Sequence, residues 1–140
     1  MKVPFGTITI DQKAKDLVNE ALNTGRVSSG KFVRQFEERF AKLVNAKEAI
    51  AVSSGTDADV LALAVLYDLG AKRGDEVIVP ALSFVATGNA VLHAGFKPVF
   101  VDIERETLNI NPSKIEAAIT PQTRAIMPVH LGGKPARMDA

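Results

Sequence analysis

The 140-residue sequence contains no cysteine, which excludes disulfides, thiolate metal sites and thiol nucleophiles and suits a reducing compartment. Charge of either sign is not in excess: 17 Lys and Arg against 16 Asp and Glu leave a formal net charge of +1, unlike the basic balance of nucleic-acid-binding proteins. The longest apolar run, residues 60–67, is far shorter than the ~20 residues of a membrane span, and MKVPFGTITI has no signal-peptide core. We therefore expect a cytoplasmic protein with no nucleic-acid or membrane partner.

Two phosphate-binding motifs are also missing, because neither GxGxxG nor GxxxxGK[ST] occurs in the chain. This excludes the usual dinucleotide and P-loop sites. His93 and His130 are far apart in sequence and no thiol accompanies them, so we predict no metal site. We expect both histidines to be packing, surface or structural residues.

The apolar periodicity predicts an alternating α/β order after two initial helices. Asp11 is placed to cap the first helix, Gly25 to stop it, and Asn111 with Pro112 to begin the last. The predicted helices cover residues 11–23, 31–44, 55–69, 84–95 and 111–119, and the predicted strands cover 49–53, 76–80, 97–103 and 124–129. Continuous Val and Ile runs are typical of strands buried on both faces, so we predict a three-layer α/β/α domain with a mostly parallel sheet. The last residues could only begin a further crossover helix, so we expect the front part of a longer protein; the alternative is a naturally short chain.

The motif SSGTDA at 53–58 lies between a predicted strand and the first turn of a helix. Free amides at a helix start, with the positive end of the helix dipole behind them, bind anions, so Gly55, Thr56 and Asp57 are candidate phosphate ligands. We expect the amides of Thr56 and Asp57 to be unbonded within the helix. The alternative is ordinary capping by Ser54 or Thr56 with no ligand.

A second motif, PALSFVATGNA at 80–90, follows the next strand at the same edge of the predicted sheet, where ligands of open α/β sheets gather. Phe84 could stack on a flat heterocycle whose phosphate sits at residues 55–57. The alternative is a core phenylalanine packed under the helix.

Three blocks of the sequence, in order, resemble the amino-terminal part of the DegT/StrS-type sugar aminotransferases. The blocks are GRVSSGKFVRQFEERFAKLVNAKEAIAVSSGTDA, GDEVIVPALSFVATGNAVLHAGFKPVFVDI and TLNINPSKIEAAITPQTRAIMPVHLGG. The resemblance implies an incomplete large domain of the pyridoxal-phosphate (PLP)-dependent transferase type, fold type I. It implies a homodimer that passes an amino group, with glutamate as donor, to a nucleotide-linked keto sugar in polysaccharide biosynthesis.

The family's site residues transfer to matching positions in this sequence. By resemblance, Gly55, Thr56 and Asp57 hold the phosphate of pyridoxal 5'-phosphate and Phe84 stacks on its ring. Ser28 and Ser29 would lie near substrate at the dimer interface, although two serines and a glycine after a helix also make an ordinary turn. The resemblance divides the chain into a helical segment, residues 1–30, and the front part of the cofactor-binding domain, residues 31–140.

No catalytic residue is assigned in this span. The family's Schiff-base lysine and the acid that pairs with the pyridinium nitrogen belong to later blocks, so we expect residues 1–140 to be inactive alone. Lys72, Lys97 and Lys134 match no such motif and are expected at the surface. The alternatives are a sugar dehydratase or regulator of the same family, or a truncated, non-catalytic interaction module.

Overall fold

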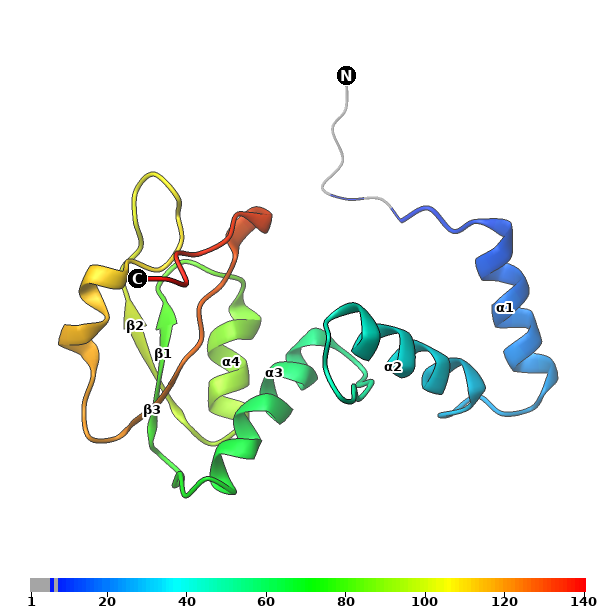
Figure 1. Ribbon diagram of the computed structural model, residues 1–140, viewed down its shortest axis with the longest axis horizontal. Helices are drawn as coiled ribbons and strands as arrows, with labels where there is room; N and C mark the ends of the chain where they lie inside the picture. The colour runs from blue at the N-terminus through cyan, green and yellow to red at the C-terminus, as the bar shows by residue number, and fades with distance from the viewer. Residues whose placement is uncertain (1–5, 7) are drawn as a thin grey trace. The chain divides into compact units, whose positions relative to one another are not determined.

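The chain divides into two units, residues 1–51 and residues 52–140, in the computed structural model. The structure describes residues 6 and 8–140 (Figure 1). Residues 1–5 and 7, part of the segment in which we predict no signal peptide, lie outside the described residues. No helix in the described part of the chain is long and apolar enough to cross a membrane.

The first unit contains two amphipathic helices, α1 (Gln12–Asn23) and α2 (Lys31–Leu43), as the periodicity predicts. Asp11 caps α1, its carboxylate accepting a hydrogen bond from the Ala14 amide at 2.7 Å. Gly25, at φ +65°, follows the last turn of α1 in the left-handed conformation that glycine adopts without strain. Of the described residues in these two helices, only Ala41 is buried. Their apolar faces are therefore largely exposed within this unit.

The second unit is built on a parallel sheet of β1 (Glu76–Pro80), β2 (Lys97–Val101) and β3 (Thr123–Ile126). The strand order is β2-β1-β3, and Ile78 at the centre of β1 is in register with Val99 and Ile126. Every residue of β1 is buried, whereas β2 and β3 at the edges are only partly covered. The prediction of continuous burial is confirmed for the central strand alone.

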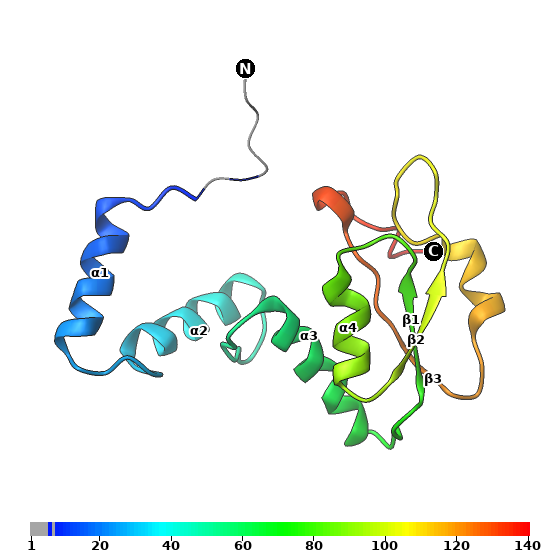
Figure 2. The same ribbon diagram turned by 180° about the vertical axis from the view of Figure 1, so that it is seen from behind.

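Helices cover one face of this sheet and short 3₁₀ turns cover the other (Figures 1 and 2). The helices are α3 (Gly55–Ala64), extended by η1 (Val65–Tyr67), and α4 (Val85–His93). The turns are η2 (Pro112–Lys114) and η3 (Glu116–Ala118), and η4 (Leu131–Gly133) lies later in the chain. The core on the helical face comprises Leu63, Val77, Val79, Val91, Ala94 and Phe96, and the core on the other face comprises Ile78, Val101 and Ile110. The three-layer α/β/α prediction is confirmed.

The number of strands was predicted wrongly, since residues 49–53 form no strand. Ile50 and Val52 in this segment are 74% and 39% exposed. A strand needs a hydrogen-bonding neighbour and a buried face, and within the described chain this segment has neither. The strand predicted at 124–129 is β3, which ends before Pro128 because proline has no amide to donate to a ladder.

The helix predicted at residues 111–119 is replaced by η2 and η3. Its start is as predicted: Asn111 is the cap, accepting a hydrogen bond from the Ser113 amide at 3.0 Å, and Pro112 follows. Pro121 disfavours a helical conformation at Thr120, and Ile119 is already extended (φ −75°, ψ 129°), so the helical segment ends at Ala118. Short 3₁₀ turns fill the available length.

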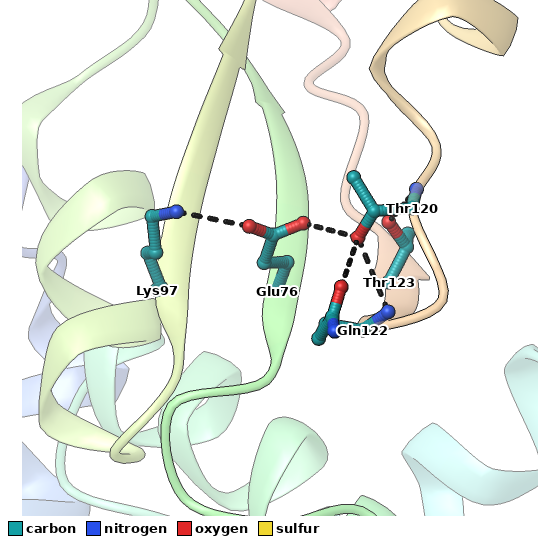
Figure 3. Close-up of polar contacts among 5 residues, drawn as sticks. All are labelled: Glu76, Lys97, Thr120, Gln122 and Thr123. Atoms are coloured by element: carbon teal, nitrogen blue, oxygen red, sulfur yellow. Dashed lines mark hydrogen bonds and ion pairs between the residues drawn. The ribbon is translucent and has the colours of Figure 1, made fainter.

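Two buried acidic residues, Asp75 and Glu76, hold the sheet together at the amino end of β1, and Figure 3 shows Glu76 with its partners. Glu76 pairs with Lys97 on β2 at 2.9 Å and accepts a hydrogen bond from the Thr120 hydroxyl at 2.7 Å. Asp75 pairs with Arg124 on β3 at 2.6 Å and accepts from the Lys72 amide at 2.8 Å. The two acids therefore connect β1 to both neighbouring strands.

These contacts favour the charged form of each acid. The Thr120 hydroxyl and the Lys97 ammonium lower the pKa of Glu76, and Arg124 with the Lys72 amide lowers the pKa of Asp75. A carboxyl whose pKa is lower in the folded state stabilises the fold above its unfolded pKa of about 4. That stability is lost as the pH falls through the folded pKa.

We predict that Glu76→Gln lowers the melting temperature at pH 7, because the amide removes the charge that faces Lys97. The variant should also lose less stability than the parent between pH 5 and pH 3 (roughly the range around the ordinary carboxyl pKa), because one linked carboxyl is gone. Thermal melts followed by circular dichroism across this range measure both effects. Glu106→Gln, at an exposed position, is the control; identical melts for both variants at every pH would contradict the prediction.

Candidate functional site

The start of α3 is organised by Ser54, its N-cap residue. The Ser54 hydroxyl accepts a hydrogen bond from the Asp57 amide at 3.1 Å and donates to the Asp57 carboxylate at 2.8 Å. Ser53 also donates to that carboxylate. Ser54 thus bonds both the backbone amide and the side chain of Asp57, and Ser53 bonds the side chain. These contacts fix the first turn of α3, and the reciprocal pairing of Ser54 with Asp57 resembles a capping box.

Two backbone donors at this helix start remain free. Within the part of the chain that the structure describes, no hydrogen bond is made by the amides of Gly55 and Thr56. Gly55 is exposed, and a Cβ built on it would meet nothing within 4 Å, while Thr56 is half-buried. The Thr56 amide is free, as predicted, whereas the Asp57 amide is bonded by the side chain of the N-cap residue Ser54, as in the capping alternative. The corner is open and presents two N–H groups and one hydroxyl.

Asp57 places a negative charge beside these donors. Hydrogen bonds from Ser53 and then Ser54 lower its pKa, so the group is ionised at neutral pH. Such a charge suits the helix dipole but cannot itself contact an anion favourably. Asp57 can contribute to anion binding only through its backbone, and only by sharing the N–H that Ser54 holds.

Phe84 immediately precedes α4, on the connection that leaves the carboxyl end of β1. Its side chain is 77% exposed, so it is not a core residue of the described chain. The ring borders a hollow of about 290 Å³ between α4 and β2, whose apolar walls include Val85, Leu92 and Phe100. The ring is therefore available to a planar ligand.

Phe84 and the start of α3 belong to the same unit, and α3 packs beside α4 through Leu63 and Val91. Gly55, Thr56 and Asp57 nevertheless do not line the hollow at Phe84. The start of α3 and the Phe84 ring are thus both accessible, but residues 55–57 lie outside the hollow that the ring borders.

Ser28 and Ser29 lie in the first unit, in the turn between α1 and α2. The Ser29 carbonyl accepts a hydrogen bond from Arg26 Nε at 3.0 Å, and Ser28 lines a hollow of about 480 Å³. Arg26, Lys31 and Arg34 line the same hollow and were not singled out from the sequence. The three cations flank the SSG turn in the sequence, but the sequence alone does not show that their side chains line the same hollow.

Lys72, Lys97 and Lys134 are exposed, as the sequence predicts. Of these, Lys97 pairs with Glu76 at the amino end of the strands. His130 Nδ1 accepts from the Ala136 amide at 3.0 Å, the structural role expected for it. Among the described residues, no group of three or more His, Asp or Glu side chains is arranged to hold a metal ion.

Comparison with known proteins gives a consistent match. The model of the DegT/DnrJ/EryC1/StrS aminotransferase family matches residues 8–140. The Bacillus subtilis spore coat polysaccharide biosynthesis protein SpsC is 46% identical over 99% of this chain and 35% of its own length. The 3-oxo-glucose-6-phosphate:glutamate aminotransferase of the same organism is 46% identical, over 99% of this chain and 32% of its own. The GDP-perosamine synthase of Caulobacter vibrioides is 45% identical, over 93% and 34%.

Solved structures show the same similarity. NtdA from Bacillus subtilis with bound PMP superimposes with a TM-score of 0.84 and 46% identity, over 99% of this chain and 32% of that one. The E. coli GDP-4-keto-6-deoxy-D-mannose-3-dehydratase with hydrated PLP gives a TM-score of 0.88 and 35% identity, over 99% and 36%. The chain spans about a third of the length of the curated relatives it matches.

We predict that Ser54→Ala lowers the free energy of unfolding by about 1 kcal/mol, the usual effect of removing a side-chain N-cap. Urea unfolding curves measure the change. Ser53→Ala is the matched control, since Ser53 bonds only the Asp57 side chain and leaves the capped amide intact. A loss from Ser53→Ala equal to that from Ser54→Ala would show that the cap is not the stabilising element.

Proposed function

Because this chain belongs to the DegT/DnrJ/EryC1/StrS aminotransferase family, we propose that the protein transfers an amino group from glutamate to a keto sugar. Its substrate carries a phosphate ester, as a nucleotide-linked sugar or a sugar phosphate. The names of two relatives support this class, a GDP-perosamine synthase and a 3-oxo-glucose-6-phosphate:glutamate aminotransferase. The reaction needs pyridoxal 5'-phosphate, the cofactor class present in the similar structures.

The residues of this chain fit that cofactor. The free amides of Gly55 and Thr56 and the Thr56 hydroxyl are the donors that a phosphate requires, at the positive end of a ten-residue helix. The open space at Gly55 allows the phosphate to approach the backbone. Phe84 offers an exposed ring face for the pyridine. When bound, the cofactor supplies the electron sink for the amino transfer.

The open start of α3 is the observation that carries this assignment. Gly55 and Thr56 would anchor the phosphate, with Asp57 contributing its shared amide, and Phe84 would restrict the tilt of the ring. Lys97 would not be the lysine that bonds the cofactor, because it pairs with Glu76 at the end of the parallel strands opposite to Phe84. Residues 1–140 alone would therefore bind the cofactor without completing the reaction.

The proposal extends to the assembly of the protein. A homodimer would cover the exposed apolar side chains of α1 and α2, among them Leu17, Val18 and Phe36. The turn at Ser28 and Ser29, between these helices, would then lie near substrate. A cytoplasmic location supplies both the cofactor and reduced conditions suited to a chain without cysteine.

A second candidate is a sugar dehydratase that uses the same cofactor. It is favoured by the 35% identity and TM-score of 0.88 to the E. coli GDP-4-keto-6-deoxy-D-mannose-3-dehydratase. The residues described here serve either reaction, since both need the phosphate anchored and the ring held. The product distinguishes them.

We predict net amino transfer by the protein at its natural length. With PLP, glutamate and either 3-oxo-glucose 6-phosphate or a GDP-linked keto sugar, 2-oxoglutarate should form in proportion to an amino sugar identified by mass spectrometry. A product that has lost a hydroxyl without gaining an amine would identify the dehydratase instead. Absence of any sugar-dependent product together with absence of cofactor binding would favour a non-catalytic interaction module.

We predict that Thr56→Val weakens PLP retention by roughly 10- to 100-fold, the effect of one hydrogen bond to a charged group. Phe84→Leu should weaken it by about 2- to 10-fold through lost stacking and leave the melting temperature unchanged, because the ring is exposed. Equilibrium dialysis with absorbance detection measures retention. Ser113→Ala removes an exposed hydroxyl on η2, outside the assigned site, and should have no effect; equal retention in all three variants would contradict the assigned site.

A further inference from the structure

A buried amide side chain joins two segments that leave the sheet from different strands. Asn109 lies in the segment that follows β2 and is only 2% exposed. Its Oδ1 accepts a hydrogen bond from the Leu131 amide at 3.0 Å. Its Nδ2 donates to the carbonyls of Lys134 and Pro135 at 3.0 and 3.1 Å. Both polar atoms of this side chain are therefore bonded to the segment that follows β3.

This tie crosses the carboxyl end of β1. In the strand order β2-β1-β3, the central strand lies between the two strands whose following segments Asn109 joins. Hydrogen bonds continue beyond the strands on both sides of β1, since the Ala81 amide donates to the Val101 carbonyl and the Met127 amide to the Ile78 carbonyl. The connection that carries Phe84 thus leaves β1 at the same end of the sheet as the tied segments (Figures 1 and 2).

Two further contacts hold the segment that follows β3. Glu104, on the β2 side of the tie, pairs with Arg137 at 2.5 Å. His130 Nδ1 accepts a hydrogen bond from the Ala136 amide at 3.0 Å, so the segment is also closed on itself. Residues 130–137 are therefore fixed both by the preceding loop and from within.

The backbone that presents Asn109 is strained. Leu108 has φ +60°, in the left-handed region that non-glycine residues seldom occupy. Such a conformation persists only where the surrounding structure over-determines it, and it is most frequent at functional sites. Here the Leu108 amide donates to the Glu104 carbonyl, and the Glu104 amide donates to the Asn109 carbonyl, each at 2.8 Å. The strained turn is thus held in the conformation that brings Asn109 to its partners.

The segment that Asn109 holds contributes little to the core. Residues 132–135 are exposed, and none of residues 130–136 belongs to the core on either face of the sheet. A buried, fully bonded amide therefore fixes a surface segment. That segment lies at the carboxyl edge, where ligands of open α/β sheets bind.

We propose that Asn109 is a positioning residue for the cofactor site: it fixes residues 130–136 as the wall of that site on the β3 side, at the edge where the connection carrying Phe84 leaves the sheet. The inference rests on the proposed function and extends the site to a residue that touches neither cofactor nor substrate. Loss of the tie frees this wall to move, and so weakens retention of the cofactor without removing any group that contacts it.

Asn109→Leu keeps the branched shape of the side chain but forms no hydrogen bond, and tests the proposal in the protein at its natural length. PLP retention should weaken by roughly 2- to 30-fold, the range for a residue that acts through its neighbours. Hydrogen exchange followed by mass spectrometry should show that the peptide containing Leu131 loses protection. Asn109→Asp is the second variant, which keeps the acceptor for Leu131 but loses the donor to Lys134 and Pro135, and it should also weaken retention.

Glu76→Gln is the control for an effect of stability alone, because it lowers the melting temperature at the opposite end of the strands and should leave PLP retention unchanged. Retention by both Asn109 variants equal to that of the parent, or an equal loss in Glu76→Gln, would overturn the proposal. Where Asn109→Leu does not fold, Asn109→Asp decides by the same comparison.

Hydrogen exchange is measured without PLP, so it tests the tie independently of the proposed function. Unchanged protection of the peptide containing Leu131 in Asn109→Leu would overturn the tie. A parent protein that retains no PLP would count against the proposed function, and loss of this protection in Asn109→Leu would still support the assignment of Asn109 as the residue that holds residues 130–136.

Discussion

Burial of β1 between two parallel neighbours is the constraint on which the second unit depends. All five residues of β1 are buried, and its apolar side chains contribute to the cores on both faces of the sheet. A parallel strand cannot be joined to its neighbour by a tight turn, so the chain must cross over the sheet between strands. That crossover is α4, and it requires the connection at residues 81–84 to leave the carboxyl end of β1.

The two ends of β1 consequently differ in chemistry. At the amino end, Asp75 and Glu76 are held by Arg124, Lys97 and Thr120, so their hydrogen-bonding capacity is used within the fold. At the carboxyl end, the connection presents an exposed Phe84. The ring is therefore available to the cofactor proposed for the carboxyl edge of the sheet, whereas the polar groups at the amino end are not.

The sequence predicted those features of the structure that depend on residues close together in the chain. The run of residues 76–80 became β1 with its predicted bounds, and Asp11 and Asn111 cap the turns that follow them. Residues 49–53 have strand-forming side chains, but a strand also needs a partner that no local pattern can supply. The sequence could not decide between a core and an exposed Phe84, because that depends on what packs against it. Capping by Ser54 was one of the two readings of the SSGTDA motif, but the sequence could not show that this cap would occupy the Asp57 amide and leave the amides of Gly55 and Thr56 free.

The central claim is that the open start of α3 and the Phe84 ring together hold pyridoxal 5'-phosphate. The most direct test is a crystal structure of the protein at its natural length with this cofactor bound. We expect the phosphate oxygens within hydrogen-bonding distance of the Gly55 and Thr56 amides, and the Phe84 ring stacked on the pyridine. A phosphate bound elsewhere, or a Phe84 ring turned away from the cofactor, would contradict the account.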